Sequence, residues 1–279
     1  MKILVTGCAG FIGYHLCNEL LKNSNVSIIG IDNLNSYYSV KLKKIRLKKL
    51  TKYRRFEFKK IDISNNQKLR VIFKKNKFDL IVNLAAQAGV RYSLKNPRNY
   101  LENNITCLFN LMEFARNNKL EHFIFGSSSS VYGNSKIAPF KEIFDTSSPL
   151  QFYGSTKKAG EVFLKTYSYL YNFPVTCLRF FTVYGPWGRP DMAIFSFTKK
   201  ILENKSLDIF NKGRMIRDFT YIDDIIEGIY KCIFRKKNKF KIYNLGNQNP
   251  IKLMSMIKLL ENNLNKKATI KFKSQHRTE

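Results

Sequence analysis

The sequence contains few residues of the kinds that bind metals or form disulfides. Its 279 residues include five cysteines and three histidines. Neither set has the short spacing of metal ligands or of a C-x-x-C redox motif, so we expect no metal site and no disulfide. The residues concerned are Cys8, Cys17, Cys107, Cys177, Cys232, His15, His122 and His276.

Long apolar runs are also missing. No segment approaches the roughly 20 apolar residues that span a membrane. A strand-like run begins at Lys2, which leaves no room for a secretory leader. The sequence therefore predicts a cytoplasmic protein without membrane insertion, long enough for a nucleotide-binding domain plus a small second lobe.

Acidic residues are scarce: 20 Asp and Glu stand against 49 Lys and Arg, a net charge of +29. Basic residues crowd segment 41–55, which is typical of a surface that binds nucleic acid or anionic membranes. The same segment, however, keeps an apolar helical stripe of Val40, Leu42, Ile45 and Leu50. We interpret the segment as a solvated helix face and expect no specific nucleic-acid partner.

The chain begins with a strand, a glycine turn and a helix. Residues 2–6 are strand-like, a G-x-x-G-x-x-G turn follows, and helical periodicity continues to Leu21. The three glycines allow a tight turn, close approach of the backbone to a pyrophosphate, and close packing of helix on strand. We therefore expect a dinucleotide site here. Its residues are Gly7, Gly10, Phe11, Ile12 and Gly13.

An acidic residue follows the second apolar run, which spans residues 26–31 and ends at Asp32. A carboxylate in this position can hydrogen-bond the ribose hydroxyls of the cofactor and repels a 2′-phosphate. The sequence therefore favours NAD over NADP.

Strand-like and helix-like segments alternate along most of the chain. Further strands are expected at 56–61, 80–84, 122–127 and 175–181, and helices at 67–75, 97–117 and 153–171. This alternation predicts an α/β fold, a Rossmann-type doubly wound parallel sheet with ligands at the carboxyl ends of the strands. We place an NAD-binding domain at 1–178 and a substrate-binding lobe at 179–279.

A tyrosine and a lysine stand one helical turn apart at the start of the last of these helices. Positions i and i+4 share a helix face, so Lys157 can lower the pKa of Tyr153 and make it a usable base. Ser128 follows a strand and can hydrogen-bond a sugar oxygen beside Tyr153. Serines at strand ends are also common turn formers.

A second pair with the same spacing is Tyr132 and Lys136. The residues between them favour a turn, so the two side chains are not expected to share a helix face. We interpret this pair as a coincidence of a loop.

These residues, together with segments 83–93, 178–193 and 217–224, resemble nucleotide-sugar epimerases of the extended short-chain dehydrogenase/reductase family, and among them the UDP-glucuronate 4-epimerases. The resemblance runs from residue 1 to about residue 265. It implies NAD as cofactor and a UDP-sugar as substrate. Tyr153 would take the proton of the sugar 4-hydroxyl while NAD accepts the C4 hydride, and Lys157 would also hold the nicotinamide ribose.

The resemblance also assigns residues to the two ligands. NAD would further contact Asp62 and Ala85. The UDP-sugar would contact Arg91, Asn104, Thr182, Arg189 and Arg217. Ser129 and Ser130 stand where related dehydratases carry Asp and Glu, which disfavours dehydration. Arg189 suits a uronate carboxylate because its planar guanidinium can pair both oxygens.

Several alternatives stay open. They are UDP-glucose 4-epimerisation, UDP-glucuronate decarboxylation, an inactive homologue that only binds NAD, and a basic scaffold for polyanions. Among partners, a second copy of the chain in a homodimer is also considered. The family's Gln-Pro-Gly-Asp motif is not found after the helix through Leu260. We therefore expect an apparently truncated substrate lobe with weak UDP-sugar binding and low activity.

Overall fold

The computed structural model describes residues 1–118, 120–135, 137–235 and 239–274. The chain forms two compact units: Met1–Phe180 with Asp223–Leu245, and Phe181–Ile222 with the residues from Gly246 onward. The chain leaves the first unit close to the expected boundary at 178. It then returns, because the strand Phe240–Leu245 pairs in parallel with Val175–Phe180. Segment 223–245 therefore does not belong to the second lobe, where the sequence analysis placed it.

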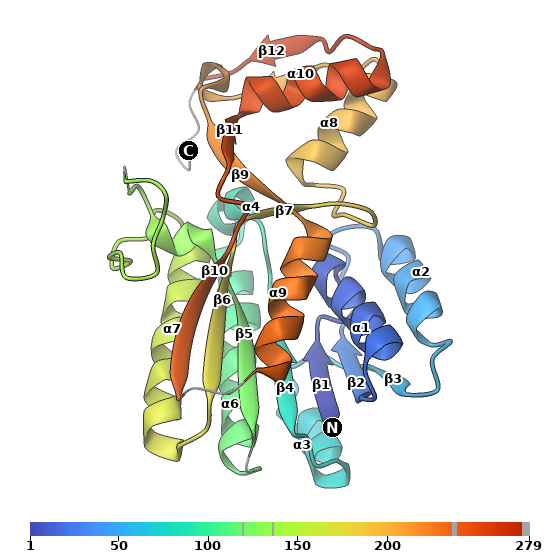
Figure 1. The fold of residues 1–279 in the computed structure, drawn as a ribbon, viewed down its shortest axis with the longest axis vertical. Helices are drawn as coiled ribbons and strands as arrows, with labels where there is room; N and C mark the ends of the chain where they lie inside the picture. Colours follow the sequence, from blue (N-terminus) through green and yellow to red (C-terminus); the bar gives the residue numbers. More distant parts are fainter. Residues whose placement is uncertain (119, 136, 236–238, 275–279) are drawn as a thin grey trace. The chain divides into compact units, whose positions relative to one another are not determined.

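The first unit is built on a seven-stranded sheet in the order β10-β6-β5-β4-β1-β2-β3, with every neighbouring pair parallel (Figure 1). The strand order reverses between β1 and β4, the place where such sheets bind ligands. The predicted Rossmann-type fold is thus confirmed. The strands are β1 (Lys2–Thr6), β2 (Ser27–Asp32), β3 (Phe56–Lys60), β4 (Leu80–Asn83), β5 (His122–Ser128), β6 (Val175–Phe180) and β10 (Phe240–Leu245).

Helices cover this sheet, and α3, α6 and α7 share one apolar core with it. The sheet contributes fully buried residues such as Leu4, Ile81 and Phe123 to that core. The helix expected at 97–117 is interrupted by the π-helical turn η1 (Leu101–Thr106). The helices are α1 (Phe11–Asn23), α2 (Val40–Leu50), α3 (Asn66–Lys75), α4 (Val90–Lys95), α5 (Pro97–Tyr100), α6 (Cys107–Arg116), α7 (Phe152–Tyr171) and α9 (Ile222–Phe234), with a 3-10 turn η2 (Ser129–Tyr132).

The second unit has its own small core. Leu207, Ile209 and Ile257 are buried there between strands and two helices. Its strands are β7 (Thr182–Tyr184), β9 (Ile216–Tyr221) and β11 (Pro250–Lys252) in one sheet and β8 (Leu207–Ile209) and β12 (Ile270–Phe272) in another; its helices are α8 (Ala193–Leu202) and α10 (Leu253–Leu264), with a 3-10 turn η3 (Asn211–Gly213).

Helix α2 buries a different face from the one expected. Lys43, Arg46, Leu47 and Leu50 are buried, whereas Ile45 is 38% exposed. Long basic side chains can be buried when their charged ends reach oxygen acceptors. Lys43 and Arg46 both do so, since each donates to a backbone carbonyl. The prediction that Ile45 belongs to the inward stripe was therefore wrong.

The described part of the chain offers neither a membrane-spanning helix nor a metal cluster. No helix there is long and apolar enough to cross a bilayer. No group of three or more His, Cys, Asp or Glu residues there is arranged to hold a metal ion. All five cysteines are free thiols in buried positions.

Candidate functional site

The carboxyl edge of the large sheet gathers the groups that the sequence singled out. Gly7 follows β1, Asp32 ends β2, Ala85 follows β4 and Ser128 ends β5. Because the strands are parallel, their carboxyl ends lie along one edge, where ligands of such sheets bind. Four residues from distant parts of the sequence are thus brought to one border of the first unit.

The glycine turn is shaped by close backbone contacts. Gly7 has a φ of +72°, and a Cβ added to it would lie 2.8 Å from the backbone nitrogen of Ala85. A Cβ on Gly13 would lie 2.2 Å from the carbonyl oxygen of Gly7. Helix α1 begins at Phe11 with Gly10 as its N-cap and no side-chain cap. The turn therefore leaves the N-terminus of α1 available to an anion, as a pyrophosphate cradle requires.

The carboxylate of Asp32 is tied to this turn. Its Oδ2 accepts a hydrogen bond from the backbone N–H of Ala9 at 3.2 Å, and its Oδ1 accepts one from Leu34 at 2.8 Å. Burial raises the pKa of Asp32, and its hydrogen bonds and the nearby Lys43 partly offset that rise. The side chain lies where the sequence predicts an acid that reads the cofactor ribose.

Asp62 connects the ends of β2 and β3. Its two oxygens accept hydrogen bonds from the Asn33 side chain at 2.9 Å and from the N–H and hydroxyl of Ser64 at 2.9 and 2.7 Å. Burial alone would raise the pKa of Asp62, but these hydrogen bonds outweigh it and leave the pKa below its ordinary value. The group is thus a carboxylate at neutral pH.

Two basic side chains at this end of the sheet were not singled out from the sequence. Arg46 donates to the carbonyl of Ala9 at 2.9 Å and to the hydroxyl of Tyr38 at 2.8 Å. Lys43 donates to the backbone and side-chain oxygens of Asn35 at 2.8 and 2.9 Å. Their spacing of three residues on α2 could have predicted that both lie on one helix face.

Tyr153 and Lys157 share one face of α7, as the spacing predicted. The Lys157 Nζ lies 5.9 Å from the centre of the Tyr153 ring. It donates a 2.7 Å hydrogen bond to the carbonyl oxygen of Gly126, next to the end of β5. Lys157 is 4% exposed, and this burial lowers its pKa to about 8. The lysine is therefore anchored within reach of the phenol, and it is mostly protonated at neutral pH.

Ser128 caps the short helix η2. Its hydroxyl accepts a hydrogen bond from the N–H of Ser130 at 3.2 Å and donates to the hydroxyl of Ser130 at the same distance. Ser128 thus has the turn-forming role that is common for serines at strand ends. A capping hydroxyl does not exclude a further hydrogen bond to a ligand, since its oxygen has two lone pairs.

Asn104 lies in the π-helical turn, which is a feature often found near functional sites. Its Oδ1 accepts from the N–H of Gln87 at 2.8 Å, and its Nδ2 donates to the Gln87 carbonyl at 3.1 Å and the Thr156 hydroxyl at 3.0 Å. These bonds occupy the amide and tie the segment after β4 to α7. Arg91, by contrast, is an exposed residue of α4.

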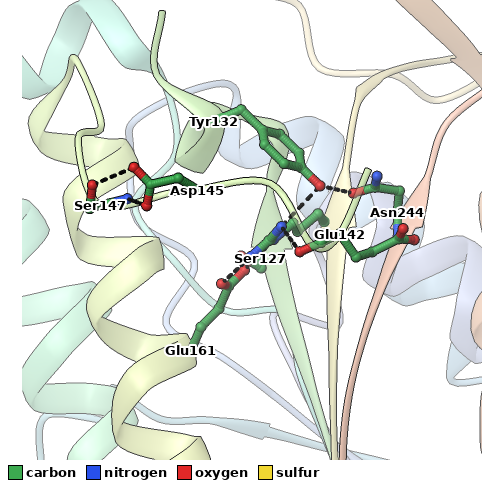
Figure 2. A network of polar contacts seen from close by, with 8 residues as sticks. Ser127, Tyr132, Glu142, Asp145, Ser147, Glu161 and Asn244 are labelled. Carbon is green, nitrogen blue, oxygen red and sulfur yellow. Dashed lines mark hydrogen bonds and ion pairs between the residues drawn. The ribbon is translucent and has the colours of Figure 1, made fainter. Parts of the chain in front are cut away.

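Tyr132 is more than a loop residue. It is 3% exposed at the end of η2, and its hydroxyl donates to Asn244 Oδ1 at 2.6 Å while accepting from Arg179 at 2.9 Å (Figure 2). Arg179 also forms a two-bond ion pair with Glu161, whose carboxylate accepts a third bond from Ser127. Lys136, the other half of that sequence pair, lies outside the described residues. The interpretation of the pair as a coincidence of a loop therefore stays a prediction, while Tyr132 by itself belongs to a buried hydrogen-bond network.

The second unit carries the other three predicted residues. Thr182 begins β7 and lies opposite Phe219 of β9. Arg217, exposed on β9, donates to the carbonyl of Ile216 at 2.8 Å. Arg189 forms two hydrogen bonds with the carboxylate of Asp191, a pair that is partly exposed. A substrate carboxylate would therefore have to compete with Asp191 for this guanidinium.

Together, the doubly wound sheet, the glycine turn and the Tyr-Lys pair define a Rossmann-type nucleotide-dependent enzyme. The model of the NAD dependent epimerase/dehydratase family matches residues 3–246. The chain belongs to this family, whose cofactor is NAD.

The chain is also similar to individual relatives. It is 46% identical to Protein CapI of Staphylococcus aureus, over 96% of this chain and 85% of that protein. It is 43% identical to the UDP-glucuronate 4-epimerase of Thermodesulfobacterium geofontis, over 99% of this chain and 84% of that one. The crystal structure of UDP-glucuronic acid 4-epimerase from Bacillus cereus with UDP-glucuronic acid and NAD matches with a TM-score of 0.92 and 40% identity, covering 100% of this chain and 88% of that chain.

Proposed function

We propose that this chain catalyses the NAD-dependent 4-epimerisation of UDP-glucuronate to UDP-galacturonate. The observation that carries the proposal is the Tyr153–Lys157 pair, held on one helix face beside the carboxyl end of a dinucleotide-binding sheet. The similarity to UDP-glucuronate 4-epimerases over almost the whole chain supports this choice of substrate.

The first unit has residues that suit NAD. The backbone of Gly7, Gly10, Phe11, Ile12 and Gly13 forms the anion cradle, and Asp32 and Asp62 supply carboxylates at the ends of the next two strands. Ala85 lies against Gly7 at the same border. When bound, NAD supplies reversible hydride transfer at the C4 carbon of the sugar.

Tyr153 acts as the general base and acid of the reaction. It removes the proton from the sugar 4-hydroxyl and later returns it to the 4-keto oxygen on the other face of the turned ring. The Lys157 ammonium favours the phenolate by attraction across a poorly solvated site. Ser128 hydrogen-bonds the reacting oxygen, with Ser130 keeping its hydroxyl oriented.

The remaining candidates bind the substrate. Arg91, Thr182 and Arg217 contact the UDP-sugar, and Arg189 pairs the uronate carboxylate after releasing Asp191. Asn104 contributes by fixing the segment around Gln87, since its own amide is occupied. The carboxylate clamp also opposes loss of CO₂ from the 4-keto intermediate, which is a β-keto acid.

The buried thiols and the basic residues of α2 bear on the setting in which the enzyme works. We infer that it works in the cytoplasm, where its five buried thiols stay reduced. The basic residues of α2 attract anionic substrates, and no specific nucleic-acid role is assigned to them.

We also infer a homodimer through η1, α6 and α7, which pack on one another. These helices expose large apolar side chains, namely Leu101, Phe109, Val162, Phe163 and Leu170. Exposed apolar side chains on helices that pack together suit a second copy of the same chain. Sedimentation should find a dimer that Val162→Glu converts to monomers, and a monomeric unaltered protein would reject this assembly.

The experiment that tests the proposed function is incubation of purified protein with UDP-glucuronate and, separately, UDP-glucose, followed by NMR of the products. UDP-galacturonate from the first substrate, with little conversion of the second, is the expected result. UDP-galactose or a decarboxylated pentose product would instead favour the alternative enzymes. No conversion of either would favour the inactive NAD-binding homologue.

A further inference from the structure

Three polar side chains lie in one row across neighbouring strands, two of them buried and the third partly buried. Ser127 of β5 is opposite Arg179 of β6, and Arg179 is opposite Asn244 of β10. Because residues in one such row project from the same face, their polar groups converge on one side of the sheet. Glu161 of α7 reaches Ser127 and Arg179 from that side (Figure 2).

Helix α7 is attached to the sheet by two consecutive turns. Lys157 donates to the carbonyl of Gly126, and Glu161, one turn later, accepts a 2.6 Å bond from Ser127 and bonds of 2.9 and 2.8 Å from Arg179. Tyr153 lies one turn before Lys157 on the same face. The contacts of Glu161 therefore fix how far α7 is rotated and shifted, and with it the position of the phenol.

Tyr132 connects the same network to η2 and to β10. The hydroxyl of Tyr132 links Arg179 to Asn244, and Tyr132 ends the helix η2 that Ser128 caps. Asn244 in turn donates to the carbonyl of Phe140 at 2.9 Å and, through its N–H, to the carboxylate of Glu142 at 2.8 Å. The network thus holds η2 and residues 140–142, which lie between Ser128 and Tyr153 in the sequence.

The buried ion pair at the centre of the network is expected to contribute little net free energy to folding. The side chains of Arg179 and Glu161 are each 2% exposed. At such depth, the cost of removing two charges from water largely cancels their attraction, and apolar side chains of similar volume often serve folding equally well. What apolar side chains cannot supply is a fixed direction, because they make no hydrogen bonds.

Resting on the proposed function, we propose that Glu161, Arg179 and Tyr132 are positioning residues that hold Ser128 in register with Tyr153 and Lys157 for the epimerisation. They do not need to touch the substrate. Their effect on the reaction passes through the placement of η2 and α7.

The first test compares two variants that each remove one phenolic hydroxyl. Tyr132→Phe breaks the links to Arg179 and Asn244, and the control Tyr167→Phe breaks a 2.6 Å bond to Glu113 further along α7. We expect Tyr132→Phe to lower kcat about tenfold or more with little change in KM, because small misplacements of reacting groups slow catalysis strongly. Tyr167→Phe should keep kcat within about twofold. Equal kcat values at equal melting temperatures would overturn the proposal.

The second test removes the ion pair while keeping its volume. The double variant Glu161→Met/Arg179→Met should fold with an unchanged or higher melting temperature. We expect it to retain UDP-glucuronate affinity and lose about tenfold to a hundredfold in kcat. Wild-type kcat in this folded variant would overturn the positioning role. If it fails to fold, Tyr132→Phe decides.

A third measurement separates this proposal from the proposed function. If the unaltered protein converts no UDP-sugar, the proposed function fails, and hydrogen exchange of the NAD-loaded protein still tests the network. Faster exchange at residues 129–155 in Tyr132→Phe but not in Tyr167→Phe supports positioning. The same exchange pattern in both variants contradicts it.

Discussion

Each of the two compact units contains an arginine held by two hydrogen bonds to a carboxylate, and the two pairs differ in exposure. Arg179 and Glu161 in the first unit are each 2% exposed, whereas Arg189 and Asp191 in the second are 18% and 35% exposed. A buried pair cannot exchange partners without leaving a charge unsolvated, so it fixes geometry. A partly exposed pair can exchange one carboxylate for another at small cost. Under the roles proposed above, the same chemistry would serve placement in the first unit and recognition in the second.

The largest effect is expected at the proposed catalytic base in the first unit. Tyr153→Phe should lower turnover by at least about a thousandfold while NAD stays bound, because it deletes proton transfer and no cofactor contact. Rapid-mixing kinetics and quantification of bound NAD would measure both. Tyr132→Phe, which acts only through placement, should lose far less. The comparison breaks down if the two variants are equally inactive.

The buried Lys157 should make the free energy of unfolding depend on pH. Lys157 has its pKa lowered from 10.5 to about 8, so its burial costs the folded state about 3 kcal/mol below pH 8. This cost disappears as pH rises from about 8 to 10.5, where the unfolded chain also loses the proton. The stability of Lys157→Met relative to the unaltered protein should therefore fall by about 3 kcal/mol across that window.

Urea unfolding of NAD-free protein at several pH values would measure this difference. Lys158, the next residue along α7, is only partly buried and offers a matched control. The pH dependence measured for Lys158→Met is the baseline from which the change for Lys157→Met is counted. A constant difference for Lys157→Met would mean that its ammonium is well solvated.

The exposed pair should respond to the ligand instead. Arg189→Ala should weaken binding of UDP-glucuronate by about 2 kcal/mol, the scale of a lost charge-assisted hydrogen bond, with little effect on UDP alone. Asp191→Asn should have the opposite sign, because it frees the guanidinium for the substrate. Calorimetric titration of both variants with both ligands checks this. Equal losses for UDP and UDP-glucuronate would assign Arg189 a structural role.

The smallest expected effect concerns cofactor choice. Asp32 repels a 2′-phosphate, so the unaltered protein should bind NAD more tightly than NADP. Asp32→Ala should narrow that gap by about 1 to 2 kcal/mol, the scale of one charge interaction near a protein surface. Fluorescence titrations with both nucleotides would measure it. A preference for NADP in the unaltered protein would reject the assignment.

The sequence alone predicts the cofactor turn and the Tyr153–Lys157 pair, but not the network around Arg179. The glycine turn, Asp32 and the Tyr153–Lys157 pair follow from short spacings, because a turn and a helix are set by neighbouring residues. The pairing of Arg179 with Glu161 joins residues 18 apart, and that of Tyr132 with Asn244 joins residues 112 apart. These contacts depend on strand order, which brought β10 back beside β6 against expectation. Of these four residues, only Glu161 could have been predicted from a short spacing, because it stands one helical turn after Lys157.

Oxidation at C4 is tested most directly with UDP-glucuronate that carries deuterium on that carbon. Oxidation and reduction at that carbon within one binding event should yield UDP-galacturonate that keeps its deuterium on C4, with no solvent hydrogen incorporated. NMR of the product reports both the configuration and the label. Loss of deuterium to solvent, or exchange at C5, would contradict C4 oxidation by a retained cofactor and require a different reaction for this site.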